Sequence, residues 1–479
     1  MISNTEDENS SQFHHEKKDA DLNIKRENKK FFDSKVIGRS ARKRRIAVVL
    51  IGERVNPALK IFIMAGQHGD ERYSRKAAER LISYLIRTRA KDFPSNVCIA
   101  ILPNANPDGS HKNTRRTADG IDMNSDHLIL TSEENRAIHS FIRSWKPNLI
   151  IDVHNYSPKR KYLEEKNYVF YHDVLIDAPT NLGVRRRLDQ EKLNNLINEI
   201  RLNFDSHNYT CDRCVLIDPK GRIRHSTNDI EDARNFLSLR YDILTILVEG
   251  REPLSEEDQK NQINRTISAQ YLAVLSILKW ATRNTDFLLD KSRLPSYNKG
   301  DKIPIRFNYT LSKQPFRMNF KNTKTNQIEE VVFTNYQSLK TIRFVKLPYA
   351  YAIPDDKESV IHLLHSHGFI SERIMDSKSN RVQRHMILSF EPSKVTTKPR
   401  PPWNVRLIFT DEKKVLSNYE VFPTNQEGGH CLPLLLEPQS KYSLPRYGEM
   451  DLGIIPGNYY PILRVMEENK VKMDTSNTG

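Results

Sequence analysis

Short, continuously apolar runs alternate with amphipathic segments through the first part of the chain. Apolar runs closed by glycine, proline or a polar residue are typical of strands that are buried on both faces. The segments between them repeat apolar residues at spacings of three and four, as on one face of a helix. This pattern predicts an α/β fold with a mixed, mainly parallel sheet flanked by helices. The predicted strands are 46–52, 59–66, 97–102, 149–153 and 243–248.

Helix ends can be placed where the sequence offers a capping signal or a proline. Thr131 and Glu134 have the spacing of a capping box, and Pro147 follows the apolar pattern that ends at Trp145. One predicted helix begins near Glu71. Three others span 131–145, 179–204 and 263–280.

From about residue 296 the pattern changes to alternation of apolar and polar residues, as at Ile305, Phe307 and Tyr309. Such alternation favours strands with one face in the core and the other in solvent. A proline-rich segment, 394–402, predicts a stiff linker or an edge. We therefore expect three parts: a disordered polar tail over 1–35, an α/β domain over 36–290, and a smaller, mostly β region over 300–470.

Composition places the chain among globular proteins, because 38% of its 479 residues are hydrophobic and 28% are charged. No apolar run approaches the ~18–20 residues of a membrane helix. Residues 1–40 contain no apolar segment typical of a secretory signal. Four cysteines in so long a chain do not indicate a disulfide framework, and the Cys211 and Cys214 pair is interpreted as two ordinary thiols. We expect a cytoplasmic protein without a membrane partner.

The net charge of +15 could indicate a nucleic-acid partner, but the charge is spread along the chain. The densest basic clusters, 42–45 and 185–187, are short and contain no aromatic residues on which bases could stack. Solubility or attraction of an acidic substrate is the better interpretation, and no nucleic-acid partner is expected.

His68 and Glu71 follow a predicted strand and stand at the start of a predicted helix. Side chains at this spacing can converge on one cation, and imidazole with carboxylate is a donor set that zinc accepts. A catalytic zinc site needs a third protein ligand and one open position. Asn106 and His154 also follow predicted strands, so they are expected at the same edge of the sheet as His68.

Six residues in a fixed order resemble the zinc carboxypeptidase family, the carboxypeptidase A-like metallopeptidases, over residues 36–285. Those residues are His68, Glu71, Arg115, Asn124, His154 and Glu249. The matching segments are GQHGDE (66–71), NPDG (106–109), RRTADGIDMNS (115–125), IIDVH (150–154) and TILVEG (245–250). The resemblance implies that residues 36–290 form the catalytic domain. The stretches 347–354 and 434–447 look like an accessory region of some bacterial members.

The resemblance implies one zinc ion held by His68, Glu71 and His154, with Glu249 as the catalytic base. Its other implied roles fall on residues of the segment 115–125. Arg115 would stabilise the oxyanion and contact the substrate, Asn124 would bind the substrate's terminal carboxylate, and Asp122 would orient His68. Zinc lowers the pKa of a bound water to ~7, and a nearby carboxylate can take its proton.

The chain departs from the family pattern at two places. Ser125 stands where the family has an arginine that grips a terminal carboxylate, so Arg116, Arg222 or Arg224 could serve instead, or the substrate could lack that group. No tyrosine matches the family's mobile active-site tyrosine, and His225 is a candidate substitute by position alone.

The function predicted from the sequence is that of a zinc metallocarboxypeptidase acting on a peptide or peptide-like substrate. Two alternatives stay open: an N-acyl amino acid deacylase of the aspartoacylase type, and a non-catalytic relative that binds peptides. Simpler interpretations exist for single residues, since His154 could be a core histidine and Glu249 could pair with Arg251. His362, His365 and His367 are dense enough to suggest a metal site, but an amphipathic helix end explains them better.

Overall fold

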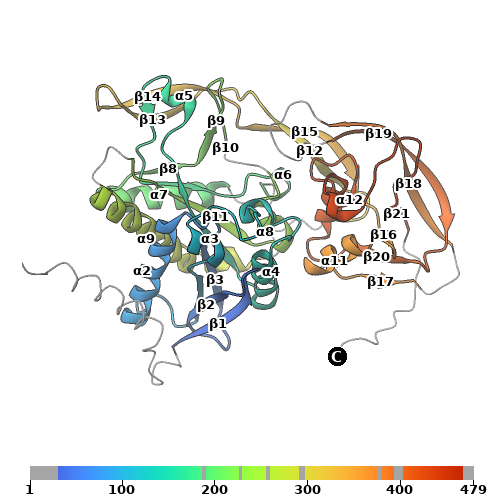
Figure 1. Ribbon diagram of the computed structural model, residues 1–479, viewed down its shortest axis with the longest axis horizontal. Coiled ribbons are helices and arrows are strands. Elements are labelled where there is room, and N and C mark those ends of the chain that lie inside the picture. The colour runs from blue at the N-terminus through green and yellow to red at the C-terminus, as the bar shows by residue number, and fades with distance from the viewer. Residues whose placement is uncertain are drawn as a thin grey trace, which may run out of the picture.

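The computed structural model describes residues 31–185, 190–225, 229–254, 259–290, 297–374, 379–392 and 403–467. Figure 1 shows two lobes, one built around a large sheet from the N-terminal part of the chain and one formed by the C-terminal part. Of the predicted tail, 1–30 lie outside the described residues. Residues 32–35 are not tail but belong to β1, because Phe32 is buried and pairs with Ile51.

The first lobe is organised around an eight-stranded sheet. Its strands in spatial order are β1 (Phe32–Arg39), β2 (Arg45–Gly52), β4 (Val97–Leu102), β3 (Leu59–Ala65), β5 (Leu149–Tyr156), β11 (Leu244–Arg251), β7 (Val174–Asp177) and β8 (Cys211–Arg213). The four central strands β4, β3, β5 and β11 run parallel. Their outer neighbours, β2 beside β4 and β7 beside β11, pair with them in the antiparallel direction. This arrangement confirms the predicted mixed, mainly parallel sheet.

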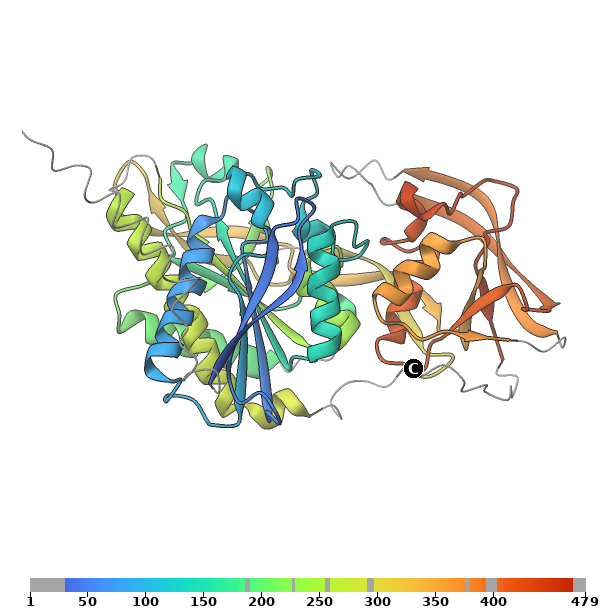
Figure 2. The same ribbon diagram turned by 60° about the horizontal axis from the view of Figure 1, so that its bottom comes forward.

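Helices cover both faces of this sheet, as Figure 2 shows. One face packs against α2 (Arg72–Thr88), α7 (Gln190–Asp205) and α9 (Gln259–Arg283), and the other against α4 (Glu133–Trp145) and α8 (Ala233–Tyr241). The central strand β3 supplies both cores, because successive side chains of a strand point to opposite faces. Ile61 and Ile63 lie in the first core, and Phe62 and Met64 lie in the second.

Three sequence predictions about these elements are wrong in detail. β5 and β11 each continue three residues past their predicted ends, so His154 and Glu249 lie within strands. The N-cap of α4 is Ser132 and not Thr131, because Asp126 accepts hydrogen bonds from the backbone N–H groups of both residues and fixes the turn.

The helix predicted over 179–204 is instead two helices, α6 (Leu182–Arg185) and α7, with 186–189 outside the described residues. The backbone N–H groups of Thr180 and Asn181 both donate to Oδ1 of Asn235, each at 2.9 Å. This side-chain acceptor holds the segment outside a helix, so helical structure begins only at Leu182.

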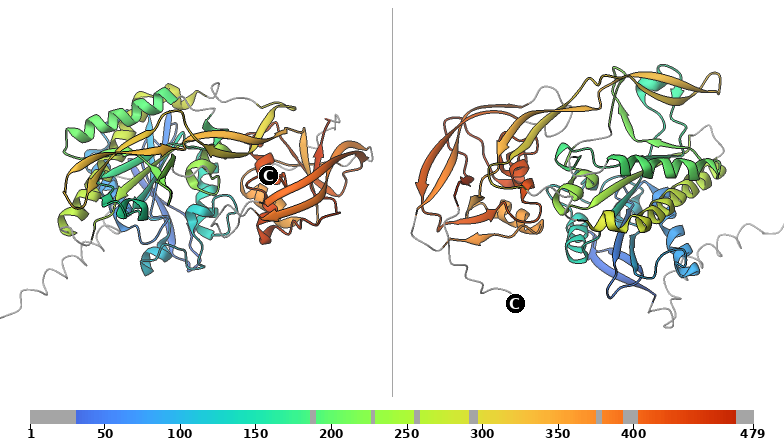
Figure 3. Two further views of the ribbon diagram at one scale, coloured as in Figure 1. Left: turned by 90° about the horizontal axis from the view of Figure 1, so that it is seen from above. Right: turned by 180° about the vertical axis from the view of Figure 1, so that it is seen from behind.

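A second sheet combines strands of the first lobe with a hairpin from the region after residue 300. Its strands are β6 (Tyr168–Val169), β13 (Phe316–Asn322), β14 (Ile328–Asn335), β10 (Arg222–His225) and β9 (Val215–Ile217). The β13–β14 hairpin comes from the region predicted as accessory, yet it pairs with β6 and β10 of the first lobe. The ribbon of β12 (Lys302–Thr310) and β15 (Ser338–Lys346) connects this hairpin to the C-terminal lobe (Figure 3).

The C-terminal lobe is mostly β, as predicted. Its six-stranded sheet contains β17 (Glu372–Arg373), β20 (Tyr419–Pro423), β16 (Ala350–Pro354), β21 (Leu463–Val465), β18 (Asn380–Pro392) and β19 (Trp403–Lys414). Its described helices are α11 (Glu358–Ser366), α12 (Leu432–Leu436) and the short η4 (Gly429–Cys431), η5 (Leu444–Arg446) and η6 (Gly448–Met450). The proline-rich segment 394–402 lies outside the described residues.

The two lobes share one hydrophobic core, in which Leu128 and Phe236 of the first lobe pack with residues such as Phe369 of the second. His367, from the histidine-rich segment, is buried at this junction, and its Nε2 lies 2.9 Å from the carbonyl oxygen of Leu128. The remaining short elements of the first lobe are α3 (Pro107–Lys112), η2 (Met123–Ser125), α5 (Lys161–Glu164) and α10 (Thr285–Leu289). No described helix combines the length and the apolar character that crossing a bilayer requires.

Candidate metal centre

The loop between β3 and α2 positions His68 and Glu71. Gly66 turns the chain after β3 with a positive φ of 71°, a conformation that favours glycine. Gly69 lies against another loop so closely that a Cβ there would stand 2.1 Å from the carbonyl carbon of Gly109. Glu71 then forms the N-cap of α2. The local chain path therefore brings both side chains to the carboxyl end of β3.

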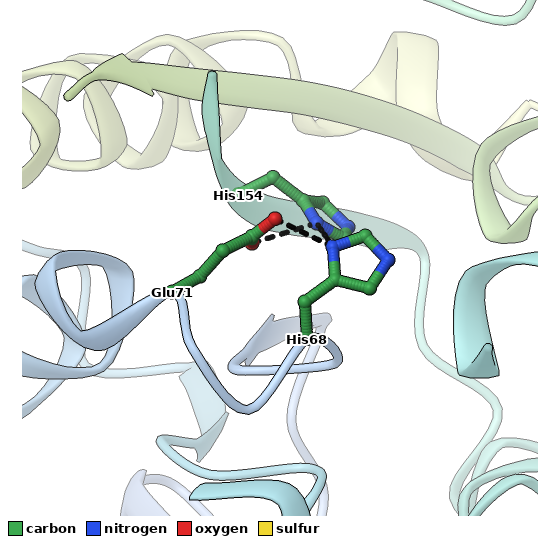
Figure 4. Close-up of side chains that lie close together, drawn as sticks. All are labelled: His68, Glu71 and His154. Atoms are coloured by element: carbon green, nitrogen blue, oxygen red, sulfur yellow. Dashed lines mark hydrogen bonds and ion pairs between the residues drawn. The ribbon is translucent and has the colours of Figure 1, made fainter. Parts of the chain in front are cut away.

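Figure 4 shows that the structure brings His68, Glu71 and His154 together, with His154 projecting from β5. Nδ1 of His68 lies 2.5 Å from Oε1 of Glu71, and Nδ1 of His154 lies 3.0 Å from Oε2. The two Nδ1 atoms are 3.3 Å apart. Among the described residues this is the one group of three or more His, Cys, Asp or Glu side chains whose donor atoms could share a metal ion.

A carboxylate on the far side of each imidazole fixes which nitrogen faces the centre. Nε2 of His68 lies 3.2 Å from Oδ1 of Asp122, and Nε2 of His154 lies 3.1 Å from Oδ1 of Asp152. An Nε2–H that donates to a carboxylate leaves a lone pair on Nδ1. In that tautomer both Nδ1 lone pairs are available to one cation bound between the two rings.

The separation of the two imidazole nitrogens fits zinc. Two nitrogens bound to one tetrahedral zinc at about 2.05 Å stand about 3.3 Å apart, and the two Nδ1 atoms have this separation. Burial alone would lower the pKa of His154, but Asp152 and Glu71 raise it well above its ordinary value. The two carboxylates therefore attract positive charge to His154, which favours a cation at this centre.

Glu249 lies on β11 directly beside His154, and the two residues are register partners in neighbouring parallel strands. Burial raises the pKa of Glu249 to about 7. Its Oε2 is buried and has no hydrogen-bond partner among the described residues. A carboxylate with a free oxygen beside a metal centre is suited to accepting a proton.

Arg115 lies at the open side of the centre, with half of its side chain exposed. Its Nε donates to Oδ2 of Asp122 at 2.9 Å, and its Nη1 lies 3.2 Å from Nδ1 of His68. The remaining N–H groups of this guanidinium can donate to a substrate, since a guanidinium has five in all.

Asn124 lies in η2 and also contacts the start of α8. Its Oδ1 accepts a hydrogen bond of 3.2 Å from the backbone N–H of Ala233. Because the carbonyl oxygen is used, the side chain presents its NH₂ group as a donor. Ser125 is exposed.

The three arginines considered as substitutes at Ser125 each make another contact. Arg116 donates to the carbonyl of Gly120 at 2.9 Å, Arg222 pairs with Asp218 at 2.6 Å, and Arg224 stacks on Tyr309. His225 ends β10, but its side chain lies outside the described part of the structure.

Sequence reasoning missed three side chains that support the centre. Asp152 contacts His154, and Nε2 of Gln67 donates to Oδ1 of Asp152 at 2.8 Å. Oε1 of Gln67 lies 2.8 Å from Nε2 of the buried His127. Strand periodicity could have indicated Asp152, because residues 152 and 154 of one strand share a face. No local signal indicates His127.

The sequence model of the zinc carboxypeptidase family matches residues 22–162 of this chain. The matched range contains the three residues that converge in the centre, and it also contains Arg115 and Asn124. Glu249 lies beyond its end.

Among curated proteins, carboxypeptidase 2 of Trichophyton tonsurans is 23% identical over 422 residues, which cover 85% of this chain and 76% of that one. Carboxypeptidase 2 of Trichophyton rubrum is 22% identical over 426 residues, with the same coverage.

Solved structures with a similar arrangement include a metallo-carboxypeptidase from Burkholderia cenocepacia, with a TM-score of 0.40 and 19% identity over 51% of this chain and 64% of that one. A metallo-carboxypeptidase from Pseudomonas aeruginosa in complex with (2-guanidinoethylmercapto)succinic acid has a TM-score of 0.43 and 20% identity over 58% and 69% of the two chains.

Proposed function

Because the zinc carboxypeptidase family model matches residues 22–162 and carboxypeptidase 2 of Trichophyton tonsurans is similar over 85% of this chain, we propose that the chain belongs to this family and hydrolyses an amide bond at or near the carboxyl end of a peptide. The observation that carries this proposal is the convergence of both Nδ1 atoms, 3.3 Å apart, on the carboxylate of Glu71. His68, Glu71 and His154 would hold one zinc ion and leave a position open for water. When bound there, zinc would lower the pKa of that water to ~7 and polarise the substrate carbonyl.

In this proposal Glu249 accepts the proton of the attacking water and passes it to the leaving amine. Its location beside His154 and its unpartnered Oε2 support the assignment. A pKa of about 7 is suited to a group that must accept and then release a proton near neutral pH.

Arg115 is the proposed electrophile, because its guanidinium lies beside His68 and is half exposed. There it can stabilise the negative charge that develops on the carbonyl oxygen. Asp122 keeps His68 oriented and also fixes the Nε end of Arg115.

The substrate's terminal carboxylate would be bound by the NH₂ group of Asn124 together with Arg115. A hydroxyl at Ser125 cannot provide the paired, charged hydrogen bonds of a guanidinium. We therefore expect a weaker grip on a terminal carboxylate than an arginine at this position would give. His225 stays a candidate contact by its position in the sequence.

The test is release of the C-terminal amino acid from a panel of peptides by the zinc-loaded full chain, compared with Glu249→Gln. Loss of at least ~100-fold in kcat with one zinc per chain retained is expected, since general base catalysis contributes about 10²–10⁴-fold. Glu133→Gln, an exposed position on α4, is the matched control. Full activity of Glu249→Gln would refute the assigned base. Faster cleavage of N-acyl amino acids than of any peptide would indicate the deacylase alternative.

A further inference from the structure

A cavity of about 580 Å³ lies at the opposite end of the central strands from the metal centre. Its wall includes Lys60 and Leu244, which stand at the starts of β3 and β11. Its other side is formed by residues of the C-terminal lobe such as Gly368 and Gln426. Leu149 to His154 on β5 spans roughly 17 Å of extended strand, so the cavity is separate from the metal centre.

Arg240, at the end of α8, is the most unusual residue of this wall, because its guanidinium is buried without an acidic partner. The residue is 3% exposed and forms no salt bridge in the described part of the chain, although the charge of Glu427 is near enough to interact with it. Its Nη1 donates to the backbone carbonyl of Glu427 at 2.9 Å, and its guanidinium stacks on Phe369. Its Nε has no hydrogen-bond partner among the described residues. A buried guanidinium keeps its charge, so it strongly favours an anion nearby.

Two further cations line the same wall at the end of α4. Arg143 lies in the last turn of this helix, and Lys146 is its C-cap. Neither forms a salt bridge with an acid in the described part of the chain. Lys60, in contrast, donates to the carbonyl of Trp145 at 2.6 Å. Three acids also line the wall: Asp242 and Asp290 are half-buried, and Glu427 is exposed to solvent.

The remainder of the lining is partly apolar, and it includes Ile142, Ile243 and Phe287. A volume of this size is in the range of small-molecule sites, which are roughly 300–1,000 Å³. A ligand with one anionic group and an apolar body would match both parts of the wall. Guanidinium groups prefer the planar geometry of a carboxylate, to which they can donate two parallel hydrogen bonds.

We propose that this cavity is a second ligand site, which binds a small organic carboxylate between Arg240, Arg143 and Lys146 with its apolar body against Ile142 and Phe287. The site lies between the lobes, so its ligand would contact both of them. It is independent of the hydrolytic function proposed for the metal centre.

The experiment is titration calorimetry of the zinc-loaded full chain with cyclohexanecarboxylate, its neutral amide and inorganic phosphate. We expect binding of the carboxylate and at least ~10-fold weaker binding of the amide, because hydrogen bonds to a charged acceptor are stronger than those to a neutral one. Phosphate should also bind at least ~10-fold more weakly, since it lacks an apolar body. Equal binding of phosphate or of the amide would overturn the proposed ligand class.

Variants locate the site and separate it from the metal centre. Arg143→Gln and Lys146→Gln should each weaken carboxylate binding about 10-fold. Arg87→Gln and Lys76→Gln, exposed positions on α2, are the matched controls. Binding that is lost in Arg115→Gln and kept in Arg143→Gln would place the ligand at the metal centre and overturn the proposal.

Discussion

Glu249 and His154 are register partners on the neighbouring parallel strands β11 and β5, so their side chains leave the sheet on the same face. The backbone hydrogen bonds of the central sheet therefore fix the distance between the proposed base and a proposed metal ligand. Loop flexibility cannot change that distance. The same sheet edge receives His68 and Glu71 from the end of β3.

Asp152→Asn should weaken zinc binding about 10–100-fold, since carboxylates behind a ligating histidine typically contribute that much. The amide still fits beside Nε2 of His154 but does not hold the proton there as a carboxylate does. Zinc affinity measured by competition with a chelator checks this expectation. Asp411→Asn, an exposed position on β19, should bind zinc as the unmodified chain does.

Gly69→Ala should lower stability by about 1–3 kcal/mol and reduce the zinc content, because the added Cβ would overlap backbone atoms of 109–110. The backbone there cannot move without displacing the loop that carries His68. Gly448→Ala is the control, since a Cβ at that position meets no atom within 4 Å. Urea unfolding and zinc analysis measure the two effects. Unchanged zinc content in a folded Gly69→Ala protein would contradict the role given to this close contact.

Ser132→Ala should reduce the free energy of unfolding by about 1–2 kcal/mol, because Oγ of Ser132 accepts the backbone N–H of Asn135 at the start of α4. Thr131→Ala should cost less than about 0.5 kcal/mol, as expected for an exposed residue that does not cap the helix. Denaturant unfolding of the two variants measures the difference. The reverse order would favour the capping box predicted from the sequence.

Acid should destabilise the fold through the buried histidines at the lobe junction. Burial lowers the pKa of His367 to about 3, whereas an unfolded histidine titrates near 6.5. Between these values the unfolded chain binds a proton that the native protein excludes, so the free energy of unfolding decreases as pH falls below ~6.5. From pH 7.5 to 5 this one residue should account for about 2 kcal/mol.

His367→Gln removes the histidine that binds a proton only in the unfolded chain. The free energy of unfolding of this variant should therefore depend less on pH over the same interval. His362→Gln, an exposed position on α11, should keep the pH dependence of the unmodified chain. Urea unfolding at pH 7.5, 6 and 5 compares the three proteins. Parallel stability curves for His367→Gln and the unmodified chain would exclude His367 as a source of the acid sensitivity.

The sequence predicted the central sheet because strands such as β3 and β4 are buried on both faces and therefore consist of uninterrupted apolar residues. It predicted the convergence of His68, Glu71 and His154 because these residues stand in a recognisable order after such strands. It misplaced the ends of β5 and β11, since polar residues at 154 and 249 are ordinarily signs of a loop. Parallel pairing with each other keeps both segments in the sheet.

Other features depend on contacts between distant parts of the chain. The choice of Ser132 as N-cap follows from Asp126, and the orientation of His154 follows from Asp152 and Gln67. The hairpin of β13 and β14 has the alternation of any two strands, and nothing in that alternation says that it pairs with β6 and β10. Alternation specifies which face is buried but not which strand is the neighbour.

Because that hairpin lies between β6 and β10, a protein truncated at residue 290 would lose the middle of a sheet and not merely an appended module. Phe170 and Ile223 would lose their apolar cover, and two short strands would be left with unpaired edges. Such a fragment should aggregate or be digested by proteases. Anyone who wishes to study the hydrolytic half on its own would need to keep residues 316–335, for example by joining the hairpin to residue 290 through a designed loop.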